Sequence, residues 1–219
     1  MLPFTTEQFL EVFTNYNIAI WPAQIAAYLL GGVAVALLFL QPTGSDRAVA
    51  GILAVMWLWT GFAYHAIWFA VINQAAYLFA VLFIVQGCYL IHAGVYRRQI
   101  RFGIRRGPAA WVGAAFVVYA AILYPLIGIA TAHRYPAMPM FGVTPCPVTV
   151  FTFGMLLLTR GPVPRPLLVI PVVWSLIGGS AAILLSVPQD WLLLVSGGIA
   201  VALMVIRDRG QRFSVLPTI

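Results

Sequence analysis

Residues 81–124 read VLFIVQGCYLIHAGVYRRQIRFGIRRGPAAWVGAAFVVYAAILY. An apolar run over 75–96 is followed by a loop with five arginines and by a second apolar run over 109–131. Each run is long enough to cross a hydrocarbon core of about 30 Å as a helix, and the charged loop must remain in water. The pattern therefore predicts two membrane-spanning helices joined by a cytoplasmic loop.

The composition of the whole chain agrees with this. Of its 219 residues, 63% are hydrophobic and 8% are charged, and the mean hydropathy is +0.98. Such a chain cannot give a water-soluble domain a polar surface, so its partner is the lipid bilayer. Although the net charge is +7, we expect no nucleic acid partner, because no basic patch alternates with exposed aromatic residues.

Apolar runs between helix breakers define the rest of the architecture. The sequence predicts an all-α, polytopic membrane helix bundle with seven transmembrane helices, near 18–40, 49–72, 75–96, 109–131, 146–159, 166–186 and 190–206. The fifth run is short and is flanked by prolines, so the alternative count is six.

Arginine sets the orientation, since all 12 cationic side chains are arginine and lysine is absent. Seven spans place 11 of them on one side and only Arg134 on the other, whereas six would leave Arg207, Arg209 and Arg212 outside. Basic residues stay in the cytoplasm. We therefore expect a multi-pass protein of the bacterial inner membrane, with its N-terminus outside and its C-terminus inside.

Three regions follow from that topology: an outer-surface interfacial helix over 1–17, a single transmembrane bundle over 18–206 and a cytoplasmic tail over 207–219. The first has no basic residue and so no signal-peptide pattern. Thr5 and Gln8 have the spacing of a capping box, and apolar side chains then recur on one helical face from Phe9 to Tyr16.

The positions of ionisable residues exclude several protein classes. All five acids, Glu7, Glu11, Asp46, Asp190 and Asp208, lie outside the predicted spans, and Asp190 is expected to cap the last one. No carboxylate is therefore expected in the bundle core. A retinal protein is excluded because it needs a lysine. Haem is disfavoured because His65 and His92 lie at different depths, so no cofactor is predicted.

The second span contains WLWTGFAYHAIWF, residues 57–69. At α-helical spacing Trp57, Gly61, His65 and Trp68 share one face, with Tyr64 beside them. This pattern predicts an aromatic-walled ligand site, with Gln86 of the third span as a polar partner. The alternative is that Trp68 belongs to the interfacial aromatic belt and that His65 hydrogen-bonds a neighbouring helix.

Residues 133–154, HRYPAMPMFGVTPCPVTVFTFG, form the loop before the fifth span and its first half. Cys146 between two prolines lies at a helix start, where the thiolate is favoured. With His133, Met138 and Met140 it would suit a soft metal ion. The alternative is that Pro-Cys-Pro only starts a helix. Cys88 lies too deep to form a disulfide with Cys146.

Three stretches together resemble an uncharacterised bacterial family of multi-span membrane proteins. They are PFTTEQFLEVFTNYNIAIWPAQ, WLWTGFAYHAIWFAVIN and HRYPAMPMFGVTPCPVTVFTFG. The resemblance implies a membrane bundle of this length and assigns no activity to any residue.

The leading functional hypothesis is binding or transport of a small neutral, aromatic or soft-metal solute. Its site would open outward between spans two, three and five. A structural or assembly subunit is the alternative, with Gly178–Gly179 and Gly197–Gly198 as contact faces for a partner or a second copy of the chain. A membrane enzyme is less favoured, because no buried acid or base accompanies a nucleophile.

Overall fold

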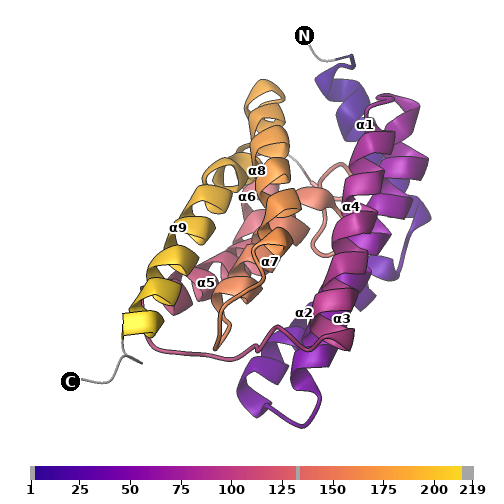
Figure 1. Cartoon of the computed structure of the whole chain (residues 1–219). Helices are drawn as coiled ribbons and strands as arrows, with labels where there is room; N and C mark the ends of the chain where they lie inside the picture. The colour runs from indigo at the N-terminus through magenta and orange to yellow at the C-terminus, as the bar shows by residue number, and fades with distance from the viewer. Residues whose placement is uncertain (1–2, 132–133, 214–219) are drawn as a thin grey trace, which may run out of the picture.

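The computed structural model describes residues 3–131 and 134–213, and these fold into helices joined by short loops (Figure 1). The helices are α1 (Thr6–Ala19), α2 (Ala23–Leu40), α3 (Ser45–Trp59) with η1 (Thr60–Trp68) and η2 (Phe69–Val71), α4 (Ala76–Leu90) with η3 (Ile91–Tyr96), α5 (Pro108–Val118) with η4 (Tyr119–Leu123) and α6 (Tyr124–Ala130), α7 (Pro145–Leu157), α8 (Pro166–Leu184), η5 (Pro188–Asp190) and α9 (Trp191–Phe213). The prediction of an all-α fold is confirmed.

Six helical segments of the described chain are long and apolar enough to cross a membrane. They are Ala23–Leu40, Ser45–Val71, Ala76–Tyr96, Pro108–Ala130, Pro166–Leu184 and Pro188–Arg209. Each overlaps a predicted span. The fifth predicted span corresponds to α7, whose 13 residues extend only about 20 Å.

Helix α7 lies at the centre of the bundle. All of its side chains are buried except that of Cys146, which is half-buried. Its apolar residues occupy every face, which is typical of a helix surrounded by protein. On one side Gly154 allows close contact with Gly113 of α5, and on another the Trp57 indole N–H donates to the Thr152 hydroxyl (2.8 Å).

The loop before α7 is fastened to α1. The Asn17 amide donates to the carbonyls of Pro136 (2.7 Å) and Met138 (2.8 Å), and the Tyr16 hydroxyl donates to the Val143 carbonyl (2.7 Å). Burial raises the pKa of Tyr16 above its usual range, so the hydroxyl remains a donor. The face of helix α1 that carries Tyr16 therefore packs against the rest of the protein. The capping box at Thr5 is confirmed.

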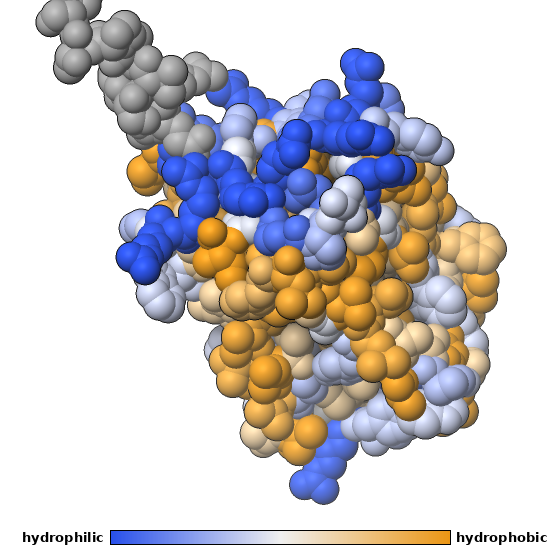
Figure 2. All heavy atoms as spheres, turned by 90° about the horizontal axis from the view of Figure 1, so that it is seen from below, coloured by the Kyte–Doolittle hydropathy of each residue, from blue (hydrophilic) through white to orange (hydrophobic). Residues whose placement is uncertain are grey.

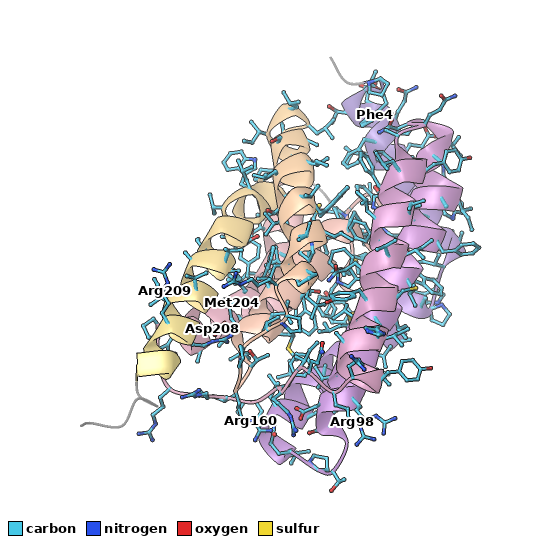
Figure 3. All side chains as sticks on the ribbon, in the orientation of Figure 1. Phe4, Arg98, Arg160, Met204, Asp208 and Arg209 are labelled. Carbon is cyan, nitrogen blue, oxygen red and sulfur yellow. The ribbon has the colours of Figure 1, made fainter. Side chains whose placement is uncertain are left out.

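The two ends of the bundle differ in charge. The loops after α2, η3 and α7 meet at one end, which we call the arginine end. There the Phe102 amide donates to Asp46 (2.7 Å) and the Arg207 guanidinium to the Thr159 hydroxyl (3.0 Å). Viewed from that end, hydrophilic side chains form a continuous band (Figure 2). Arg98 and Arg160 lie there, and Phe4 lies at the opposite end, the α1 end (Figure 3).

Candidate functional site

The second spanning segment does not remain an α-helix over its aromatic stretch. Residues Thr60–Trp68 form a π-helix, in which the Phe69 amide bonds the Tyr64 carbonyl five residues earlier. The longer turn places Tyr64 and Phe69 on the same face, with stacked rings 5.7 Å apart. These two rings and the His65 imidazole form one side of a cavity.

Trp57 and His65 still share a neighbour, because both rings lie near Phe83, at 4.4 and 4.8 Å between centroids. The expected single face is wrong for Trp68, because the π turn rotates this residue away from the α-helical pattern. Trp68 instead faces the Tyr16 ring at 6.2 Å.

The cavity lies toward the α1 end and has a volume of about 230 Å³. Helix α1, η1, the segment leading into α4, the start of α7, α8 and η5 all contribute to it. Its walls are mainly apolar and aromatic. The aromatic and titratable residues that line it are Phe4, Phe9, Phe13, Tyr64, His65, Phe69, Phe79, Cys146, Trp174 and Asp190.

His65 is the least satisfied polar side chain at this cavity. It is fully buried, and neither ring nitrogen has a hydrogen-bond partner among the described residues. Its ring lies 4.8 Å from Phe83, 5.0 Å from Trp174 and 5.7 Å from Phe79, measured between centroids. A buried polar group without a partner costs about 1–3 kcal/mol, so His65 is ready to bond a ligand.

Asp190 contradicts the expectation of a bundle core without a carboxylate. It is buried, with 3% of its surface exposed, and it lines the cavity. The Tyr124 hydroxyl donates to its carboxylate, and Cys146 lines the same cavity. The short turn Pro188–Asp190 packs against α6 and α8, so Asp190 faces protein instead of capping α9 in water.

A second π-helical turn builds the support for Asp190. Residues Tyr119–Leu123 form η4, so Tyr119 and Tyr124, five residues apart, lie on one face with rings 6.3 Å apart. The Tyr119 hydroxyl donates to the Gln189 carbonyl (2.7 Å) beside the acid. The sequence contains a signal for this π turn, because Pro125 has no amide hydrogen to donate within a regular α-helix.

Only some of the predicted site residues meet at the cavity. Tyr64, His65 and Cys146 line it. Gln86 lies elsewhere, where its amide donates to the Leu167 carbonyl (3.0 Å). The helices α1 and α8, which contribute most of the remaining wall, were missed because their aromatic and small residues carry no motif.

The residues proposed for a soft metal ion do not gather in the described structure. Met138 is buried and Met140 is half-buried, and neither lines the cavity that holds Cys146. His133 lies outside the described residues. Among the described residues, no three His, Cys, Asp or Glu side chains are arranged to hold a metal ion.

The expectation that no buried acid or base accompanies a nucleophile is wrong. Asp190 and His65 are buried and line the same cavity as Cys146.

The chain was compared with models of known protein families. Residues 6–215 match the model of a family described as a family of unknown function, DUF6064. The chain belongs to this family. The DUF6064 match includes every helix that lines the cavity. Among the lining residues of the described structure, only Phe4 precedes the match. No curated protein and no solved structure is significantly similar to the chain.

Proposed function

We propose that this DUF6064 protein is a multi-pass protein of the bacterial inner membrane that binds or transports a small organic solute at the cavity near its α1 end. The proposed topology has seven crossings, an outer N-terminus and an inner arginine end. The continuous segment α5, η4 and α6 runs away from the arginine end, and α8 begins at that end. The loop 134–144 and the short α7 lie between them in the chain, so together they make the crossing back to the arginine end. The retention of basic residues in the cytoplasm supports the orientation.

The observation that carries the proposed solute is the cavity of about 230 Å³ with aromatic walls. A dry apolar cavity of about 150 Å³ is enough to bind benzene. On that scale this cavity suits a molecule of about nine non-hydrogen atoms. An organic solute is favoured over a soft metal ion, because Met138 and Met140 are not in the cavity wall.

The structural-subunit alternative loses its main support. Three of the four glycines expected to contact a partner pack α8 against α9 within the chain. A Cβ on Gly179 would lie 2.6 Å from Leu194, and one on Gly197 would lie 2.3 Å from the Ser175 hydroxyl. Gly178 likewise packs against Leu193.

Binding of 2-phenylethanol, which has about nine non-hydrogen atoms, tests the proposal. We expect the purified full chain in lipid nanodiscs to bind it saturably, measured by calorimetry or by a rise in thermal stability. Ala181 lines the cavity, so Ala181→Leu should fill it and weaken binding about tenfold or more. Ala36→Leu makes the same change at an exposed position of α2 and should bind like the wild type.

Two results would overturn the proposed site. One is a wild-type protein that stays folded in nanodiscs and shows no saturable binding of the alcohol. The other is equal weakening by Ala181→Leu and Ala36→Leu, which would mean that the alcohol dissolves at the lipid-facing surface.

A further inference from the structure

We infer that the solute bound in this cavity carries a protonated amine on its small apolar body. The inference rests on the proposed solute site and adds the charge and the polar group of the ligand. It follows from three features of the cavity: a buried carboxylate without a cation, an unpartnered imidazole and a wall of aromatic rings.

The first feature is the Asp190 carboxylate. Its hydrogen-bond partner in the described structure is the uncharged Tyr124 hydroxyl. No arginine among the described residues lines the cavity, and the chain contains no lysine. A buried charge is stabilised by an opposite charge within a few ångströms. A cationic ligand would supply the charge that the protein itself does not place there.

The second feature is His65, whose two ring nitrogens lack partners while the ring is fully buried. A neutral imidazole always has one nitrogen that accepts a hydrogen bond. An ammonium group has up to three N–H donors and no acceptor. An amine bound in this cavity therefore has two acceptors in the wall, the Asp190 carboxylate and the imidazole.

The third feature is the aromatic wall. Phe13 and Phe69 stack on either side of Tyr64, with centroids 5.4 and 5.7 Å from it, and Trp174 stands edge-on to the His65 ring at 5.0 Å. Aromatic faces carry negative potential and attract organic cations, most strongly where water is excluded. The same rings also accept the apolar body of the ligand, so the wall suits an alkyl or aryl amine better than a hydrated metal ion.

A matched pair of probes separates this inference from the proposed function. The amine 2-phenylethylamine and the alcohol 2-phenylethanol have the same shape and size and differ in charge at neutral pH, because an alkyl amine titrates near the pKa of lysine. We expect the purified wild-type chain in nanodiscs of uncharged lipid to bind the amine about tenfold or more tightly than the alcohol.

The variant Asp190→Asn tests the source of that preference. It should remove the preference, so that the variant binds the amine and the alcohol with dissociation constants within a few-fold of each other. The control Asp208→Asn makes the same chemical change at the arginine end, where Asp208 pairs with Arg207, and should keep the full preference. Size-exclusion chromatography and circular dichroism establish that each variant is folded.

The outcomes are distinct. If neither probe binds, the proposed site fails. If the alcohol binds as tightly as the amine in wild type, the site stands and the amine inference is overturned. An amine preference that survives in Asp190→Asn also overturns the amine inference. If Asp190→Asn does not fold, the wild-type comparison of the two probes decides alone.

Discussion

Replacing Gly154 with alanine tests the position of α7, on which the cavity floor depends. A Cβ at Gly154 would lie 2.8 Å from the Gly113 carbonyl oxygen and 3.0 Å from the Val117 amide nitrogen. Both are backbone atoms and cannot rotate away. Helices α5 and α7 would have to separate by about 0.6 Å to restore an ordinary contact of 3.4 Å. Overpacking of this kind costs about 1–3 kcal/mol, against a gain in helix propensity of about 1 kcal/mol.

The matched control is Gly198→Ala on α9, where an added Cβ has no atom within 4 Å. This variant keeps only the gain in propensity and should be as stable as wild type or slightly more stable. We expect Gly154→Ala to unfold at a lower temperature than Gly198→Ala, measured by thermal denaturation in one detergent, and to bind 2-phenylethanol more weakly. Equal melting temperatures for the two variants would show that the close crossing of α5 and α7 is incorrect.

Two further changes probe the contacts that hold α1 and α9 in place. Tyr16→Phe should lower the free energy of unfolding by about 1–3 kcal/mol, because it leaves the buried Val143 carbonyl without its donor. The control Tyr77→Phe, at an exposed site, should change the free energy of unfolding little in the same titration. Arg207→Lys keeps the charge but loses the planar fork that reaches the carbonyls after α7, so it should destabilise the chain by about 1–2 kcal/mol. Arg209→Lys, an exposed position, is the comparison, and equal stability of the two lysine variants would contradict a bonding role for Arg207.

Much of the fold was predictable because lipid imposes simple rules on the sequence. A spanning helix must be long and apolar, and the six such helices of the described chain coincide with six of the seven predicted runs. The short fifth run was harder to interpret. Its Thr149 and Thr152 hydroxyls bond carbonyls four residues back, and its small Gly154 permits close packing. Hydropathy alone cannot distinguish a short helix buried in protein from one that meets lipid.

The candidate site was less predictable because it depends on two departures from α-helical geometry. Counting at 3.6 residues per turn placed Trp57, His65 and Trp68 together, and the π turn of η1 separates Trp68 from the other two, which both lie against Phe83. The π turn of η4 has the opposite effect and brings Tyr119 and Tyr124 together beside Asp190. Such turns are frequent at functional sites.

The π turns η1 and η4 serve the same region of the molecule. An α-helix in place of η4 would turn Tyr119 and Tyr124 to different faces, and at most one of them could then reach the segment Gln189–Asp190. The acid would lose a donor that no other described side chain on α6 replaces. The sequence offers Pro125 as the local cause of the turn, but the benefit arises only when η5, 64 to 71 residues later, folds against it. That long-range dependence explains why Asp190 was predicted to be a helix cap at the membrane surface and is instead part of the cavity floor.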